Sequence, residues 1–75
     1  MSQGFPLALA KEGSTVHVTK LRGSSDMQRH LQSLGFVPGA AVDLVTQAAG
    51  QVIVLVKGAR LGLNQETSRN VYVEE

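Results

Sequence analysis

Residues 31–42 constrain the fold of this chain more than any other stretch, because they predict a helix end, a tight turn and a strand start in immediate succession. Leu31 and Leu34 are spaced to share one face of a helix. Gly35 follows, where a helix end needs a residue that tolerates the left-handed conformation. Phe36 comes next, at a position from which an apolar side chain folds back over Leu31. The helix is therefore predicted to end at this glycine.

Pro38 and Gly39 continue the stretch as the central residues of a type II turn. Proline fixes φ at the second position of such a turn, and glycine accepts the positive φ of the third. The chain leaves the turn extended, so residues 41–45 are predicted to start a strand. A helix and a strand thus meet at a fixed angle, and we call residues 31–42 the corner.

Two elements are predicted before the corner. Residues 15–21 alternate between apolar and polar side chains, as expected of a half-buried strand. Ser25 and Gln28 have the spacing of a capping box, which predicts a helix that starts near Asp26. Met27 is in helical register with the leucines of the corner, so it is expected to face the core.

The segments after the corner predict a sheet. Residues 51–57 form a β-branched run that is typical of a central strand. Gly62 interrupts the next apolar segment, residues 60–63, and predicts a strong bend or a bulge there. Residues 65–70 are polar and can hold a single helical turn before a last short strand at residues 71–73.

Composition and element order together predict the fold class. Hydrophobic residues make up 43% of the chain and aromatic residues 4%, which favours a globular domain with an aliphatic core. We expect one domain over residues 1–75, in which residues 1–6 are a loose lead-in and ordered structure begins at Leu7. Five to six short antiparallel strands, with one short α-helix inserted after the first, predict a mainly β fold, a small SH3-like barrel.

The same composition predicts a soluble protein. No apolar run approaches the length of a membrane span, and the N-terminus lacks the pattern of a signal peptide. The chain has no cysteine, which excludes disulfides and thiolate metal sites and is consistent with a reducing cytoplasm. We therefore expect a cytoplasmic protein that does not insert into the membrane.

No arrangement of side chains predicts an enzyme. The candidate bases are His17 and His30, and no motif connects either of them to a nucleophile. Ser24 and Ser25 are explained as loop and cap residues. The glycines of the corner lack the lysine and hydroxyl of a phosphate-binding loop and precede a strand instead of a helix. No catalytic residue and no cofactor is expected.

A metal site has only weak candidates, namely His17, Asp26 and His30, with Glu66 as a further carboxylate. Asp26 and His30 are four residues apart on the predicted helix. At that spacing two side chains can share an ion, or simply touch each other at the helix surface. Two ligands make a weak site, so the prediction is no metal, with weak divalent binding as the alternative.

Nucleic-acid binding is the alternative that small barrels raise, because they bind single strands through aromatic side chains beside basic residues. The aromatic residues here are Phe5, Phe36 and Tyr72. Phe36 is assigned to the helix end and Phe5 to the lead-in, which leaves no stacking platform. The net charge is only +1. We therefore expect no nucleic-acid partner and retain an RNA-binding barrel as the second alternative.

Two parts of the sequence are candidates for contact with a protein partner. Valines fill one face of the strand at residues 51–57, and Ile53 and Leu55 make the opposite face apolar as well. A small barrel buries only one face, so these two side chains either meet a partner or are covered by the helix or the N-terminal segment. The other candidates lie in the loop before the helix and on the helix: Arg22, Arg29 and His30.

The corner carries a motif that resembles the FeoA family, the small ferrous iron transport protein A. The residues that carry the resemblance are Leu31-x-x-Leu34-Gly35-Phe36-Val37-Pro38-Gly39-Ala40-x-Val42, then Gly58-x-Arg60-Leu61-Gly62-Leu63 and Val71-x-Val73. The resemblance implies a cytoplasmic SH3-like barrel that is an accessory to FeoB, the membrane GTPase permease of bacterial iron(II) uptake. It also implies a place beside the inner membrane through contact with the cytoplasmic part of that permease.

The resemblance has one close alternative and one departure. SH3-like domains also end iron-dependent repressors of the diphtheria toxin repressor type, where they can supply metal ligands to a neighbouring domain. A metal-responsive regulatory domain is therefore the first alternative, and the stand-alone domain is favoured because no helix-turn-helix portion precedes the barrel in this sequence. The departure is Gln28, which stands where many relatives have a basic residue, with Arg29 next to it.

Overall fold

The computed structural model describes residues 4–75, which form six strands and three short helical segments. The strands are β1 (Phe5–Pro6), β2 (Thr15–Leu21), β3 (Ala41–Ala48), β4 (Gln51–Val56), β5 (Ala59–Asn64) and β6 (Val71–Glu74). The helical segments are the 3-10 turn η1 (Leu7–Leu9) and the α-helices α1 (Ser25–Ser33) and α2 (Gln65–Ser68).

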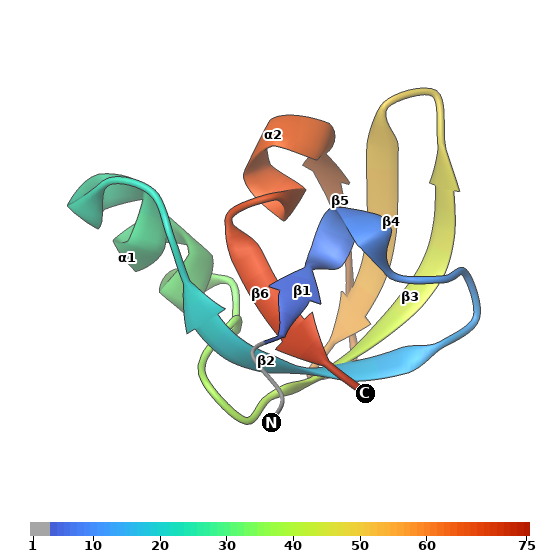
Figure 1. The fold of residues 1–75 in the computed structure, drawn as a ribbon, viewed down its shortest axis with the longest axis horizontal. Helices are drawn as coiled ribbons and strands as arrows, with labels where there is room; N and C mark the ends of the chain where they lie inside the picture. The colour runs from blue at the N-terminus through green and yellow to red at the C-terminus, as the bar shows by residue number, and fades with distance from the viewer. Residues whose placement is uncertain (1–3) are drawn as a thin grey trace.

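All six strands belong to one sheet in the order β1-β6-β2-β3-β4-β5, and every neighbouring pair is antiparallel. The sheet curls around its own core, while α1 lies to one side beyond the end of β2 and α2 connects β5 to β6 (Figure 1). The predicted fold class, a small SH3-like barrel of antiparallel strands with one short α-helix, is confirmed. The helix follows β2 and not the first strand, because the two-residue β1 precedes β2.

The sequence predicts that ordered structure begins at Leu7, but in the structure a strand begins at Phe5. Of the predicted lead-in, residues 1–3 lie outside the described residues. Phe5 and Pro6 form β1, in which Phe5 pairs with Val73 and Pro6 with Tyr72 of β6. The strand is only two residues long, and it ends where Pro6 removes a backbone donor.

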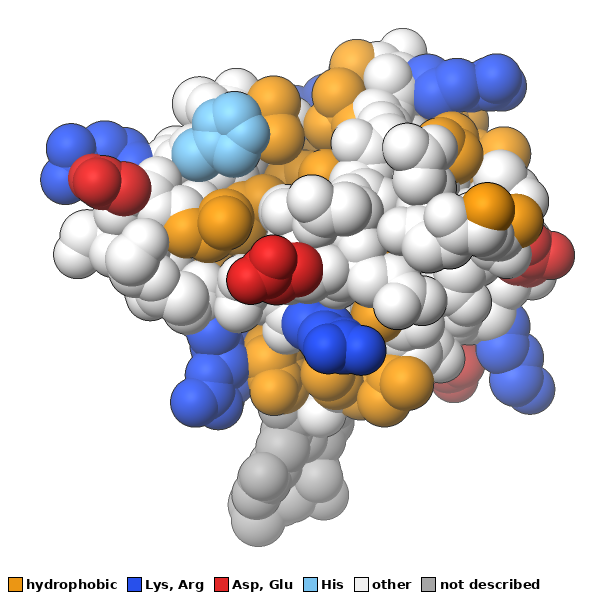
Figure 2. Space-filling model, turned by 90° about the horizontal axis from the view of Figure 1, so that it is seen from above, with side chains coloured by type: hydrophobic (Ala, Val, Ile, Leu, Met, Phe, Trp, Pro, Cys, Tyr) orange, Lys and Arg blue, Asp and Glu red, His pale blue; other side chains and the backbone are white. Residues whose placement is uncertain are grey.

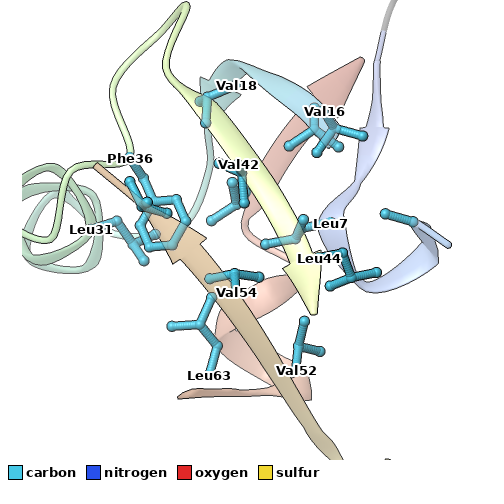
Figure 3. Packing of buried hydrophobic residues seen from close by; sticks show 14 residues of the cluster. Leu7, Val16, Val18, Leu31, Phe36, Val42, Leu44, Val52, Val54 and Leu63 are labelled. Carbon is cyan, nitrogen blue, oxygen red and sulfur yellow. The ribbon is translucent and has the colours of Figure 1, made fainter. Parts of the chain in front are cut away.

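The core is aliphatic, as predicted, with Phe36 as its one fully buried aromatic side chain among residues 4–75. Figure 3 shows the Phe36 ring beside Leu31, on the side of the core where Val42 and Val54 lie. The inward-facing side chains of every strand from β2 to β6 contribute to this cluster. The buried hydrophobic residues are Leu7, Ala10, Val16, Val18, Leu31, Phe36, Val42, Leu44, Val52, Val54, Val56, Leu63, Val71 and Val73.

The corner has the backbone geometry that its residues predict. Gly35 has φ of +108° and donates its N–H to the Gln32 carbonyl at 3.0 Å, while Phe36 donates to the Leu31 carbonyl at 3.1 Å. These two bonds satisfy carbonyls that a helix end otherwise leaves free. They also fix the position from which Phe36 enters the core beside Leu31 (Figure 3).

The Pro38-Gly39 turn fastens the corner to β2. Ala40 donates to the Val37 carbonyl at 2.9 Å, which closes the predicted turn, and Gly39 has φ of +89°. Gly39 also donates to the Val18 carbonyl at 2.7 Å, and Val18 donates to the Ala40 carbonyl at 2.9 Å. The turn is therefore part of the hydrogen-bonded sheet as well as a reversal of the chain.

The start of α1 differs from the prediction by one residue. The N-cap is Ser24, whose side-chain oxygen accepts from the Met27 N–H at 3.1 Å, and the helix begins at Ser25. Gln28 does not close a capping box with Ser25; its side-chain amide donates to the Gly23 carbonyl at 3.0 Å. Adjacent serines can both start a helix, and the loop geometry selects the first of them.

The sequence predicts a strong bend or a bulge at Gly62, and the bulge is wrong. Pairing between β4 and β5 continues without a register shift, with Gly62 opposite Ile53. A Cβ at Gly62 would lie 3.3 Å from Ile53 Cδ1, so the missing side chain makes room for the isoleucine. The register shifts occur elsewhere, between Val18 and Lys20 in β2 and between Leu44 and Thr46 in β3.

Candidate functional site

The described part of the chain has no cavity or cleft that could enclose a small molecule. On the face shown in Figure 2, acidic and basic side chains are interspersed and separated by polar and hydrophobic ones. A functional site in this part of the chain is therefore expected on its outer surface. Two parts of that surface contain candidate residues from the sequence and have a defined arrangement of side chains.

The first surface is the outer face of β4, which we define as Ile53 and Leu55. Both side chains are half-buried and point away from the valines of β4 that fill the core. Neither belongs to the partly buried hydrophobic residues that pack against the core cluster. They form a small apolar surface on the outside of the barrel.

The strands on either side provide the immediate surroundings of this face. Ile53 lies opposite Thr46 of β3 and Gly62 of β5, and Leu55 lies opposite Asp43 and Arg60. In the bulge of β3, Val45 adds a further apolar side chain that is 38% exposed. The outer face of β4 is thus an aliphatic strip with one acidic and one basic neighbour at one end.

The second surface is a basic and aromatic group on β2, on the residue that follows β2, and on β6, which we call the Tyr72 cluster: Lys20, Arg22 and Tyr72. The Lys20 ammonium lies 5.3 Å from the centre of the Tyr72 ring, and the Arg22 guanidinium carbon lies 5.6 Å from it. Tyr72 alternates with buried Val71 and Val73, so its ring is on the outside of the barrel. Both cations contact the ring within the range of cation–π attraction.

The pairing of β2 with β6 brings the residues of the Tyr72 cluster together. The register shift in β2 places Lys20 opposite Tyr72, with Thr19 as the extra residue. Arg22 is held by its backbone, which donates to the Asn70 carbonyl at 2.8 Å just before β6. The sequence identified Arg22 as a candidate but missed Lys20 and Tyr72, because their alternation signals an outward orientation without showing that they face each other.

The helix candidates are exposed and lie next to this cluster in the chain. Arg29 and His30 are on the surface of α1, which begins shortly after Arg22. In the sheet, β3 separates β4 from β2, so the structure does not join Ile53 and Leu55 with Arg22 in one surface. The predicted partner residues therefore divide into two groups.

The metal candidates also lie on separate elements. His17 is exposed on β2 opposite Glu74, whereas Asp26 and His30 are exposed on α1. Among residues 4–75, no three histidine, aspartate or glutamate side chains come close enough to hold an ion together. Asp26 and His30 keep their helical spacing, which supplies two ligands at most.

Of the three aromatic residues, Tyr72 alone contributes to an outer surface. Phe36 is buried at the helix end, and Phe5 packs against the core from β1. A platform for stacking several bases needs successive aromatic rings on one strand face. The ring of Tyr72 is instead in contact with Lys20 and Arg22.

Glu12 has an electrostatic role that the sequence did not indicate. Its carboxylate accepts from the Thr46 hydroxyl at 2.9 Å and from the Gln47 N–H at 2.5 Å, just after the bulge of β3. The bond from the Gln47 backbone, helped by Thr46, lowers the pKa of Glu12 below its ordinary value. Glu12 thus covers a part of β3 that lies beyond its pairing with β2.

The fold and the corner motif agree with one protein family. The FeoA domain family matches residues 5–75. The chain belongs to the FeoA family. A protein from Methanocaldococcus jannaschii named putative Fe(2+) transport protein A is 30% identical over 71 residues, covering 95% of this chain and 87% of its own length.

Two solved structures show the same fold in different contexts. FeoA of Stenotrophomonas maltophilia, complexed with zinc and described as a prokaryotic SH3 domain protein, has a TM-score of 0.83 at 22% identity over 93% of this chain and 89% of its own. A manganese-dependent transcriptional repressor has a TM-score of 0.90 at 18% identity. It matches all of this chain with 43% of its own length.

Membership of the FeoA family indicates the functional class of this chain. FeoA is a family of accessory transport proteins with an SH3-like fold and not a family of enzymes, as the sequence predicted. The function of the chain is therefore within ferrous iron transport. Within residues 4–75, no helix is both long and apolar enough to cross a membrane.

Proposed function

We propose that this protein is a small cytoplasmic accessory of ferrous iron uptake that binds the cytoplasmic part of a FeoB-type GTPase permease and modulates it through protein–protein contacts. The observation that carries the proposal is the outer face of β4, where Ile53 and Leu55 form an aliphatic strip that does not pack on the core. Contact with the permease would hold the protein at the inner membrane. No reaction of its own is required.

Apolar and charged contacts would have different roles in this complex. Burial of Ile53 and Leu55 against the partner would stabilise the complex in proportion to the apolar area removed from water. The Tyr72 cluster presents two cations, and Arg29 adds a third exposed cation on α1. Such groups steer association with an acidic surface and fix orientation, and their contribution falls as salt rises.

Binding to the soluble cytoplasmic domain of the permease, measured by isothermal titration and by NMR chemical-shift changes, tests the proposal. The double variant Ile53→Ser with Leu55→Ser should lose at least about tenfold in affinity. Leu9→Ser is the matched control, since Leu9 is 71% exposed and lies in η1. Arg22→Glu should weaken binding mainly at low salt.

Each outcome of this titration is decisive. Retained folding with lost affinity in the Ile53 and Leu55 variant supports an interface on β4. Unfolding of that variant, judged from the NMR spectrum, shows that the two side chains are structural and removes this surface from the proposal. No binding of the wild-type protein at high micromolar concentration contradicts the proposed function itself.

A metal-responsive role is the second candidate, because the fold also occurs in a manganese-dependent repressor and in a zinc complex of a FeoA protein. In this chain such a response would start from Asp26 and His30 on α1 or from His17 on β2. Titration with iron(II) or manganese(II) under anaerobic conditions, followed through the histidine NMR signals, tests it. Shifts limited to millimolar metal, or equal in a His30→Gln variant, would reject it.

A further inference from the structure

The two edges of the sheet are very different. At one edge, β1 is two residues long and ends in Pro6, which has no N–H to offer. At the other edge, β5 runs for six residues from Ala59 to Asn64, and no strand formed by residues 4–75 lies beyond it. A strand of this length with a free edge is a template for pairing with another strand.

The register of the β4–β5 hairpin determines which backbone groups point outward. Val56 and Ala59 flank a two-residue loop, Lys57-Gly58, in which both residues have positive φ, as in a type I′ turn. Antiparallel pairs alternate between bonded and non-bonded, so Ala59, Leu61 and Leu63 bond to β4. The N–H and C=O groups of the residues between them, Arg60 and Gly62, and the N–H of Asn64 face away from β4.

No other part of the described chain takes up these outward groups. Among residues 4–75, the backbone hydrogen bonds outside the ladders and helices include none to Arg60 or Gly62. The side chain of Asn64 is occupied as the N-cap of α2, where it accepts from the Thr67 N–H at 2.7 Å. Arg60 and Gly62 are both exposed.

We propose that the free edge of β5 binds the β5 edge of a second copy of this chain, antiparallel and centred on Gly62. In this register Gly62 faces Gly62 of the other copy, and Arg60 faces Asn64. Each Gly62 donates its N–H to the carbonyl of its counterpart, and each Asn64 N–H donates to the opposite Arg60 carbonyl. The two sheets then form one continuous sheet around a two-fold axis.

Charge and shape favour a second copy as the occupant of this edge. The antiparallel arrangement brings the end of β5 with Lys57 and Arg60 to the end where the other copy carries Glu66, exposed in the first turn of α2. The side chains that meet are thus complementary, and the like charges of the two Arg60 residues are kept apart. Direct Arg60–Arg60 pairing would require a different register.

Gly62, at the centre of the proposed pairing, would allow the outer faces of β4 in the two copies to join. Ile53 lies next to Gly62 on the outer side, within 3.3 Å of the position that a Cβ would occupy. With glycine on both sides of the axis, the space between the two Ile53 side chains is free of intervening side chains. The two β4 outer faces would therefore join into one larger apolar surface, which goes beyond the monomeric contact proposed above.

Amide exchange and sedimentation equilibrium test the pairing on the whole chain. The amides of Gly62 and Asn64 should become protected from exchange as concentration rises from about 10 μM to about 1 mM, in parallel with dimer formation. The amides of Leu61 and Leu63, bonded within the hairpin, should be protected at every concentration. Fast exchange at Gly62 in a protein that stays monomeric at 1 mM overturns the proposal.

Variants with reversed charges distinguish a loss of strand pairing between the two copies from a general loss of folding. Arg60→Glu should weaken dimerisation about tenfold or more, and adding Glu66→Arg should restore it. Arg29→Glu makes the same change of charge on α1 and should leave the dimer unchanged. A dimer that is insensitive to Arg60→Glu, or Gly62 protection that appears only when the permease domain is added, shows that the edge is not a site for a second copy.

Discussion

The corner and the outer surfaces of the sheet differ in how their geometry arises. At the corner, the decisive hydrogen bond joins Phe36 to the Leu31 carbonyl, residues that are close in the chain. In the Tyr72 cluster, a ring from β6 meets two cations from the end of β2 and the residue after it, about 50 residues earlier in the chain. The corner inserts Leu31, Phe36 and Val42 into the core and takes its shape mainly from local backbone hydrogen bonds, whereas the surfaces depend on strand register. The residues that stabilise the corner are therefore separate from those that we propose for partner contact.

Removal of the Phe36 ring from the corner is expected to lower the stability of the fold more than any of the other substitutions. Phe36 is fully buried and joins the helix end to the core, so Phe36→Ala should lower the free energy of unfolding by about 3–5 kcal/mol. Leu9→Ala, at a side chain that is 71% exposed, is the control and should change it by less than about 0.5 kcal/mol. Denaturant unfolding followed by circular dichroism measures both. A loss below about 1 kcal/mol for Phe36→Ala would show that the corner does not anchor the core.

Gly35→Ala should have the next largest effect, because it acts through two causes. Positive φ alone costs a non-glycine residue about 1–2 kcal/mol, and the new Cβ would lie 3.0 Å from Val56 Cγ1. Gly13→Ala separates these causes, since Gly13 has φ of +82° and no neighbouring atom within 4 Å of such a Cβ. Unfolding should therefore become easier in both variants, and more so at Gly35. Equal losses would mean that Val56 moves aside without cost.

The same contrast explains what the sequence predicts well. The strand at residues 15–21, the helix end at Gly35, the Pro38-Gly39 turn and the single helical turn before β6 each follow from local patterns, and the structure contains all of them. The helix start was misplaced by one residue because Ser24 and Ser25 are both good caps. Local chemistry specifies the element, and its exact end depends on the loop.

Contacts between distant strands could not be predicted in this way. Without the register shift in β2, Tyr72 would lie opposite Thr19 instead of Lys20, and the Tyr72 cluster would not exist. Glycine at position 62 predicted a strong bend or a bulge, yet there is no bulge, and the glycine makes room for Ile53 in an unbroken ladder. A bulge moves every later residue to the other face of its strand, so one unpredicted register shift changes which residues share a surface.

Replacement of the helix cap should give a smaller effect and tests the start of α1. Ser24→Ala removes the oxygen that accepts from Met27 and should cost about 1 kcal/mol of unfolding free energy. Ser25→Ala, one residue later, should stay within about 0.5 kcal/mol. The two variants differ only in position, so thermal unfolding of the pair is a direct comparison. A larger loss at Ser25 would restore the capping box with Gln28.

The smallest expected effect on stability is that of Glu12, an exposed residue, and it depends on pH. The pKa of Glu12 is lowered from its ordinary value of 4.5 by the bond from the Gln47 backbone and by the Thr46 hydroxyl. A carboxylate with a lowered folded-state pKa stabilises the fold above its unfolded-state pKa, and this contribution disappears as pH falls through the folded-state value. The Glu12 contribution should therefore be complete above about pH 5 and decrease below pH 4.5.

Glu12→Gln should remove this part of the pH dependence and leave the rest. Urea midpoints measured between pH 3 and pH 7 should differ between wild type and variant at pH 7 and converge toward pH 3, because protonated Glu12 and glutamine are both neutral. Asp26→Asn is the matched control on α1, where the carboxylate is exposed in the first turn of the helix. A wild-type curve parallel to that of Glu12→Gln over the whole range would show that the carboxylate does not hold the β3 bulge, and that the edge of β3 beyond its pairing with β2 is stabilised by its neighbours alone.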